Sequence, residues 1–179
     1  MTFKEQVLTE YPLPIQASIW NNPTIANLDD MIRLCFNDLQ TDVEIYEHTI
    51  ATGLHTILPE GTRMVSSVRL QVPFQGNTYV KWTYDPSTRV VHCRFTPSII
   101  KYKRSLKVED LDNLTGSRSL YCRTYTIIKM LEKEISYLSS IKLTSDVGEI
   151  NIDALTAKKN ELLTTLKEMK DDIMLYSNI

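Results

Sequence analysis

The chain contains 179 residues, of which 42% are hydrophobic and 23% charged, and its formal net charge at pH 7 is −2. This length is enough for one full domain with its own core, and the near-neutral charge provides no overall attraction for nucleic acid or an anionic membrane. No apolar run approaches the ~20 residues needed to span a bilayer. Lys4 and Glu5 fall where a signal peptide needs its apolar core. We therefore expect a soluble protein made in the cytosol, without membrane association.

Residues 1–42 are predicted to form two helices. Apolar residues at helical spacing predict a short helix over Thr2–Tyr11, which Pro12 ends because proline cannot continue a helix. Asn27 is a suitable cap for the second helix, with two aspartates in its first turn near the positive end of the helix dipole. The face expected to be buried consists of Leu28, Met31, Ile32, Cys35 and Leu39.

Residues 43–105 are rich in β-branched and aromatic residues with regular turn signals, which is typical of strands. Pro59–Thr62 contains proline and glycine in the order that a tight turn needs. The strand after it, Arg63–Val72, is predicted to alternate between two faces. Regular alternation places on one face Met64, Ser66, Val68, Leu70 and Val72.

The aromatic residues of a hairpin predicted over 79–95 allow two interpretations. With Arg89 and Arg94 they could form a stacking surface for single-stranded nucleic acid. Alternatively, some pack in the core and others contact a neighbouring subunit. Because the chain has no net positive charge, we favour the second interpretation and assign to a subunit interface Tyr79, Trp82 and Tyr84.

Residues 106–179 are predicted to form two long amphipathic helices separated by an extended insert, residues 142–152. Apolar residues step by three and four along both helices. In the first helix they are Leu120, Ile127, Ile128, Leu131, Ile135 and Leu138, and in the second Leu155, Leu162, Leu166, Met169 and Ile173. The charged residues between them, Glu134 included, are interpreted as a solvated face. An isolated helical pair would be only marginally stable, so it must dock on the sheet, on the second helix or on neighbouring subunits.

Histidine and cysteine residues could form a metal site or supply a catalytic nucleophile. Their spacing in this sequence favours neither of these functions. His92 and Cys93 are adjacent on a predicted strand, so their side chains point to opposite faces. His48 and His55 also fall on opposite faces if their strand is regular. The spacings of known zinc motifs do not occur. We predict no metal site, no cofactor and no catalytic residue, although a cysteine–histidine pair that meets only in space stays open.

The cysteines and the basic residues at 101–104 are interpreted as structural rather than functional residues. The cysteines are odd in number and far apart, which indicates a reducing compartment rather than a disulfide framework. Cys35 and Cys122 are expected to be buried, inert thiols. The basic run Lys101, Lys103 and Arg104 falls within residues 99–105, which are predicted to be extended, and it is interpreted as a solvated loop rather than a phosphate site. The whole pattern predicts a single α+β domain over residues 1–179, with a helical bundle, two long antiparallel C-terminal helices and a central antiparallel β region.

The order of these elements resembles a known family. The segments that carry the resemblance are the helix Leu28–Leu39, the segment Val43–Leu58, the turn and strand Leu58–Val68, the long helix from Leu120-Tyr121, and Gly148–Ile152 before a terminal helix rich in Leu, Glu and Lys. They resemble the neck, or head-completion, proteins of contractile-tailed bacteriophages. The resemblance covers roughly Ala26–Val68 and Leu120–Ile179 and is one of element order and local pattern, from which Pro73–Leu114 departs.

The resemblance implies a structural virion protein rather than an enzyme. Such a protein is a head-to-tail adaptor that forms a ring, with twelve copies, on the portal after DNA packaging, and it presents a surface to the tail-side neck protein or tail terminator. Its expected location is the neck of the virion, after a period in the host cytoplasm. Packaged DNA would pass through the channel without sequence-specific binding, which suits a near-neutral wall.

Two interfaces are expected in such a ring. The end of the chain is apolar and either inserts into a portal or partner groove or packs on its own domain; its residues are Met174, Leu175, Tyr176 and Ile179. The extended insert and the hairpin offer edges for strand addition between subunits. The insert residues assigned to this contact, alongside the three hairpin aromatics, are Lys142, Leu143, Ile150 and Ile152.

Three other functions are compatible with the same sequence. Another phage tail or baseplate component would share the same bulk features. A small enzymatic domain would need a pocket with converging polar groups, and a nucleic-acid-binding domain would show affinity that falls steeply with salt.

Overall fold

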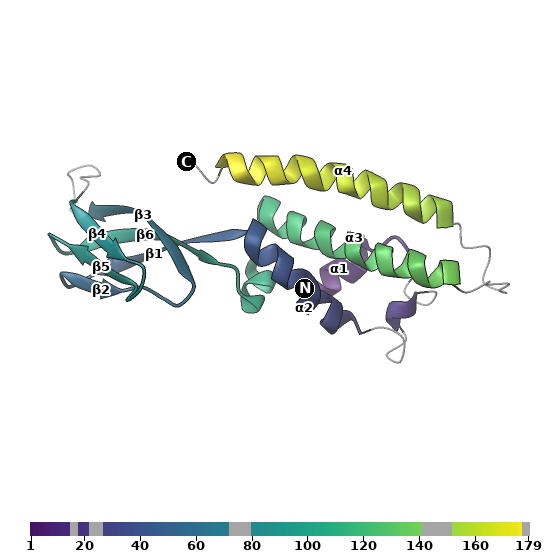
Figure 1. Cartoon of the computed structure of the whole chain (residues 1–179), viewed down its shortest axis with the longest axis horizontal. Coiled ribbons are helices and arrows are strands. Elements are labelled where there is room, and N and C mark those ends of the chain that lie inside the picture. The colour runs from purple at the N-terminus through teal and green to yellow at the C-terminus, as the bar shows by residue number, and fades with distance from the viewer. Residues whose placement is uncertain (15–17, 22–26, 72–79, 141–151, 177–179) are drawn as a thin grey trace. The chain divides into compact units, whose positions relative to one another are not determined.

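The computed structural model describes residues 1–14, 18–21, 27–71, 80–140 and 152–176, with side chains up to residue 171. The fold is α+β, as predicted. Contacts divide the chain into a helical unit, residues 1–42 and 107–179, and a β unit, residues 43–106 (Figure 1). The boundaries of the β unit fall within one residue of those predicted for the β-rich region. The expectation of a single α+β domain over residues 1–179 stays a prediction.

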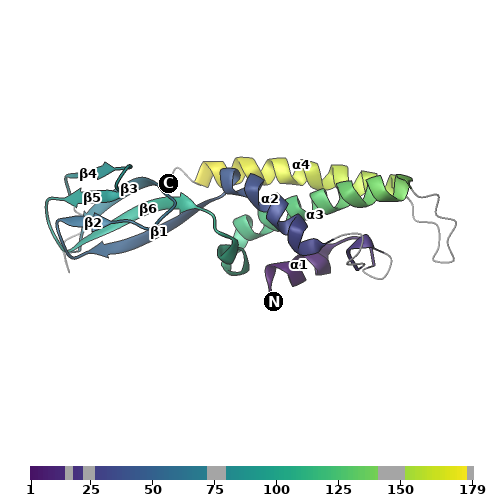
Figure 2. The same ribbon diagram turned by 60° about the horizontal axis from the view of Figure 1, so that its bottom comes forward.

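The helical unit is built around one long helix. Its described elements are α1 (Phe3–Glu10), η2 (Ile19–Asn21), α2 (Leu28–Asp42), η3 (Val108–Asn113), α3 (Gly116–Ser140) and α4 (Ile152–Tyr176). Helix α3 contacts α1, α2 and α4. Helices α3 and α4 lie side by side and run in opposite directions in both views (Figures 1 and 2), which confirms the predicted antiparallel pair.

Side-chain caps fix where the first two helices begin. Thr2 Oγ1 accepts a hydrogen bond from Glu5 N at 3.3 Å, and the Glu5 carboxylate accepts one from Thr2 N at 2.8 Å. Asn27 Oδ1 accepts one from Asp29 N at 2.9 Å, so the predicted cap of α2 is confirmed. These bonds satisfy backbone N–H groups that have no partner inside the helix.

The predicted buried faces of the helical unit are largely confirmed. In α2 the predicted face is buried except for Ile32, which is half-buried. In α3 the buried members are Ile127, Ile128, Leu131 and Leu138. Leu120 was placed wrongly in the stripe, since it is 39% exposed. Tyr121 and Cys122 occupy the buried face there, and one residue corresponds to about 100° around a helix.

The described part of the β unit contains two three-stranded antiparallel sheets, ordered β1-β6-β3 and β2-β5-β4. The strands are β1 (Glu44–Ala51), β2 (His55–Ile57), β3 (Thr62–Leu70), β4 (Trp82–Asp85), β5 (Val90–Cys93) and β6 (Ser98–Ser105). One core draws on both sheets and contains Ala51, Leu58, Val65, Val68, Val80, Val91, Cys93, Ile100 and Tyr102.

Strand β3 does not alternate regularly, which corrects the predicted faces. Val65 and Val68 are both buried although three positions apart, whereas Met64 is 48% exposed. The register against β6 shifts between Thr62 and Met64 and again between Val65 and Ser67. A β-bulge inserts an extra residue and so moves the following side chains to the other face. Val72, the last predicted member of that face, lies outside the described residues.

Two predicted turns, at 59–62 and 85–88, are confirmed by their hydrogen bonds, and the turn predicted at 75–77 lies outside the described residues. Thr62 N donates to Pro59 O at 3.3 Å, and Gly61 has a φ of 84°, a conformation in which a Cβ atom is unfavourable. In the hairpin turn, Asp85 accepts hydrogen bonds from Ser87 N at 2.9 Å and from Thr88 Oγ1 at 2.7 Å. Among the described helices, none is both long and apolar enough to cross a membrane.

Candidate assembly surfaces

Helix α4 leaves part of its apolar stripe uncovered. Among its described side chains, residues 152–171, only Leu155 is buried, with 7% exposure. The predicted stripe continues with half-buried side chains, Leu162, Leu166 and Met169. Leu163, one turn before Leu166, is 41% exposed. A helix that packs in a core normally buries a wider stripe than this, so α4 retains apolar surface for a further contact.

Hydrogen bonds connect the C-terminal part of α4 to the end of α2. Lys170 Nζ donates to Asp42 Oδ1 at 2.7 Å, and Tyr121 OH donates to Asp42 Oδ2 at 2.8 Å. One carboxylate at the end of α2 therefore joins α3 and α4. Burial, followed by the adjacent Asp42 carboxylate, raises the pKa of the Tyr121 phenol, so this donor stays protonated.

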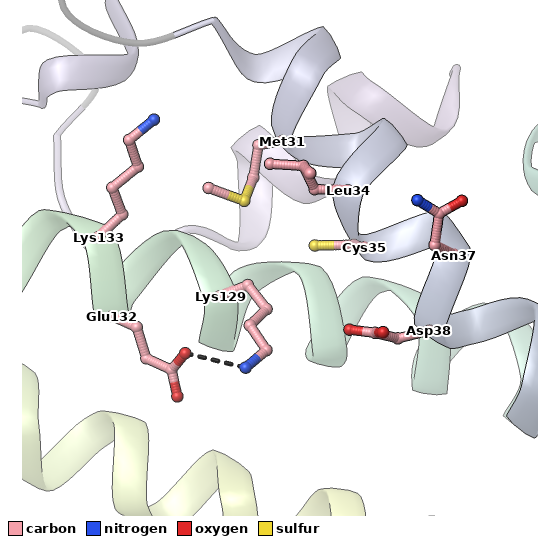
Figure 3. Close-up of a pocket in the computed structure, with 8 residues that line it drawn as sticks. All are labelled: Met31, Leu34, Cys35, Asn37, Asp38, Lys129, Glu132 and Lys133. Carbon is pink, nitrogen blue, oxygen red and sulfur yellow. Dashed lines mark hydrogen bonds and ion pairs between the residues drawn. The ribbon is translucent and has the colours of Figure 1, made fainter.

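An open cavity of about 640 Å³ lies between α2 and α3 (Figure 3). From α2 come Met31, Leu34, Cys35, Asn37 and Asp38, and from α3 come Lys129, Glu132 and Lys133. Leu34 is 64% exposed at this cavity. The lining therefore combines a small apolar patch with charged side chains, of which Lys129 and Glu132 pair at 3.0 Å.

The chemistry of this cavity favours binding over reaction. Burial raises the pKa of the Cys35 thiol to about 11, so it is protonated and a poor nucleophile at neutral pH. No histidine is among the described lining residues. Tyr125 OH donates to Asp38 Oδ2 at 2.5 Å, and Lys129 Nζ lies 5.7 Å from the Tyr125 ring centroid. These contacts with Tyr125 fix the positions of the Asp38 and Lys129 side chains at the cavity.

Glu134 on α3 was predicted to belong to a solvated charged face, and this prediction is wrong. Its side chain is fully buried. It accepts hydrogen bonds from Tyr11 OH at 3.2 Å, from Ser18 Oγ at 3.1 Å and from Ile19 N at 3.3 Å. Trp20 Nε1 in turn donates to Tyr11 OH at 3.2 Å. A carboxylate with several donors is a stable buried group, and this one anchors the described parts of the segment between α1 and α2 to α3.

The prediction for the basic run of the β unit, residues 101–104, is also wrong for two of its members. Lys103 and Arg104 lie in the central strand β6 and are buried, with 9% and 7% exposure, rather than in a solvated loop. Lys103 Nζ pairs with Glu44 at 3.2 Å and lies 4.9 Å from the Tyr46 ring centroid. Arg104 pairs with Glu47 at 2.5 Å. Pairing across the β1–β6 ladder compensates these charges, and Lys101 is the exposed member of the run.

The predicted interface residues fall into two groups. Those outside the described residues are Tyr79, Lys142, Leu143, Ile150 and Ile179, and the side chains of Met174, Leu175 and Tyr176 in the last turns of α4 are likewise not described. Ile152 begins α4 and is half-buried. Trp82 and Tyr84 are half-buried and pack against the core of the β unit. Their role at a subunit contact therefore stays a prediction.

The cysteines are placed as expected, whereas His48 and His55 do not share a strand, since they lie on β1 and β2. Cys35, Cys93 and Cys122 are buried and free, and burial raises the pKa of the Cys122 thiol to about 12. His92 and Cys93 do face opposite ways, exposed and buried. However, His55 lies directly across from His92 on neighbouring strands. Spacing along the chain could not reveal this pair or the α2–α3 cavity, because both bring together segments that are distant in sequence.

Comparisons with known proteins are sparse. No protein-family model matches the sequence, and no curated protein matches it. Among solved structures, the chain is similar to a chain in the neck of an empty GTA particle with C6 symmetry. The identity is 12%, the match covers 74% of this chain and 76% of that chain, and the TM-score is 0.31. A TM-score this low does not establish a shared fold.

Proposed function

We propose that this chain is a structural virion protein of a contractile-tailed bacteriophage. In this proposal it is a neck adaptor that forms a ring on the portal after DNA packaging and provides the attachment surface for the tail-side neck protein or tail terminator. The sequence resemblance suggests the kind of assembly. The observation that carries the proposal is the partly covered apolar stripe of α4 together with the exposed Leu163 beside it, because an apolar face that the protomer covers only in part is available for contact with another molecule.

A second copy of the chain is the occupant proposed for this stripe. A ring requires heterologous contacts, in which one face of a subunit meets a different face of its neighbour. The described surface of α4 mixes both signs of charge, as in the Lys158–Glu161 pair at 2.8 Å. The net charge of −2 on 179 residues adds little repulsion between copies. Copies can therefore pack closely around a channel.

The same charge balance suits a wall along which DNA slides. Strong phosphate binding would require a basic surface. In the β unit, the buried basic side chains are paired with Glu44 and Glu47. Packaged DNA would therefore pass through the channel of the ring without sequence-specific binding.

The direct experiment mixes the purified chain with purified portal and examines the mixture by electron microscopy. The wild-type chain is expected to add a ring to the portal. Two lysine variants test the contact surface: Leu163→Lys on α4, and Leu120→Lys on α3 as a matched control, since these leucines are 41% and 39% exposed. Leu163→Lys should weaken attachment or ring closure by about tenfold or more, whereas Leu120→Lys should behave like the wild type.

The outcomes separate the proposal from its alternatives. Equal attachment by both variants would remove the α4 stripe from the contact. A wild-type chain that ignores the portal but joins isolated tails or baseplates would favour a tail component. A third variant lacking residues 174–179 should keep its helical circular dichroism but attach more weakly to the portal. Normal attachment of that variant would reject the insertion of the chain end into a partner groove.

A further inference from the structure

Two histidines meet on the exposed side of the sheet β2-β5-β4. His55 Nδ1 and His92 Nδ1 lie 2.6 Å apart, and the ring centroids are 4.7 Å apart with an interplanar angle of 82°. Both side chains are exposed. At this separation one ring nitrogen donates a hydrogen bond to the lone pair of the other. Two nitrogen atoms that can each carry a lone pair are therefore directed at one point.

The backbone holds this pair in position. His55 and His92 are register partners in the antiparallel β2–β5 ladder. Backbone hydrogen bonds lie on both sides of the pair, from Cys93 N to Leu54 O at 2.8 Å and from Leu58 N to Arg89 O at 2.9 Å. The Cα positions are thus set by the sheet, and only the side-chain torsions are free to adjust. Such preorganisation favours a ligand that needs two donors at a fixed separation.

The geometry points to a site for a divalent transition-metal ion of the zinc, nickel or copper class, bound between Nδ1 of His55 and Nδ1 of His92. Imidazole nitrogen is a preferred ligand for these ions. Bonds of about 2.0–2.1 Å to one tetrahedral ion place the two nitrogens about 3.3 Å apart. The rings therefore have to separate by about 0.7 Å, a small torsional change for exposed side chains. Both rings then carry their proton on Nε2, so the pair releases no proton when both imidazoles are neutral.

The surroundings leave room for the rest of the coordination shell. The histidines line an open cavity of about 300 Å³ together with Leu54, Lys81, Trp82, Thr83, Cys93 and Arg94. Among the described residues no group of three or more His, Cys, Asp or Glu side chains is placed to hold a metal ion, so water would have to complete the coordination shell. Lys81 and Arg94 are the cationic groups at this cavity, and they weaken the attraction for a cation. The Arg94 guanidinium lies over the Phe95 ring, 5.8 Å from its centroid.

Isothermal titration of the full chain with NiCl₂ or ZnCl₂ in chelator-free buffer tests this site. The wild type is expected to bind one ion per chain, with saturation below about 1 mM metal. His55→Gln and His92→Gln should each lower the affinity at least tenfold. His48→Gln is the matched control and should leave the affinity unchanged, because His48 is also exposed but lies on β1, which pairs with β6.

A second measurement keeps the test independent of folding and of assembly. Thermal melting in metal-free buffer should show the same midpoint for all three variants, and only the wild type and His48→Gln should melt at higher temperature when metal is added. Binding that is equal in the wild type and in the His55→Gln, His92→Gln double variant would overturn the proposal. So would the absence of binding at 1 mM metal. Neither result bears on the proposed neck function.

Discussion

Replacement of the buried Glu134 carboxylate tests how the N-terminal segment is held on α3. In Glu134→Ala, three donors lose their acceptor: Tyr11 OH, Ser18 Oγ and Ile19 N. Leaving a buried donor unsatisfied costs about 1–3 kcal/mol. Partial relaxation and entry of water reduce the sum, so we expect the free energy of unfolding to fall by about 3–5 kcal/mol. This is a large share of the 5–15 kcal/mol by which a typical domain is stable.

Two companion variants separate the network from general effects on the helix. Glu134→Gln keeps a carbonyl acceptor and the shape of the side chain, and its amide can donate to the Tyr11 or Ser18 hydroxyl. We expect it to lose only about 1 kcal/mol. Glu132→Ala makes the same change on the exposed side of α3, where the carboxylate pairs with Lys129 at 3.0 Å, and should stay within about 0.5 kcal/mol of the wild type.

Urea unfolding followed by circular dichroism and by Trp fluorescence measures these differences. Fluorescence also reports the segment itself, because the Trp20 indole donates to Tyr11. If Glu134→Ala and Glu132→Ala lose the same stability, the buried network contributes nothing specific and the reasoning is wrong.

Three further predictions concern cysteine reactivity, a titration and a turn. Burial raises the pKa of the cysteine thiols, so iodoacetamide at pH 8 should modify none of them in the native chain and all of them in urea; fast native labelling would contradict their burial. Hydrogen bonds from Ser87 and Thr88 lower the pKa of Asp85 from 3.8 to about 2. The stabilisation from its carboxylate is therefore complete above pH 3.8 and is lost as the pH falls through about 2. An NMR titration midpoint near 4 for this carboxyl would refute the turn geometry. Gly61→Ala should lower stability by about 1–2 kcal/mol through its positive φ alone, because the nearest atom to a new Cβ is Ser105 Cβ at an ordinary 3.9 Å; an unchanged unfolding midpoint would refute that.

Local signals in the sequence predicted most of the secondary structure. The capping residues, the turn at Gly61 and the helical period of α2 and α3 each act within a few residues, so the chain carries them without reference to its partners. The faces of β3 were predicted wrongly because a bulge depends on the register against β6. Nothing in the spacing of Thr62–Leu70 reports that register.

The candidate surfaces needed tertiary structure for the same reason. Glu134 shares its acidic character with the exposed Glu132, and only its contacts with Tyr11, Ser18 and Ile19 distinguish it. His55 and His92 are 37 positions apart and meet through the β2–β5 ladder. In contrast, the stripe of α4 was visible in the sequence, and the structure adds that it is only partly covered.

The central claim is that copies of this chain complete each other's surfaces in a ring. Its most direct test is the solution mass of the full chain, by light scattering after size exclusion, over a range of concentrations with and without purified portal. We predict that the chain elutes together with the portal and raises the mass of the portal species by several times the 20.6 kDa monomer mass, and that Leu163→Lys removes most of this increase. A chain that stays monomeric at every concentration and adds no mass to the portal would show that its surfaces need no second copy.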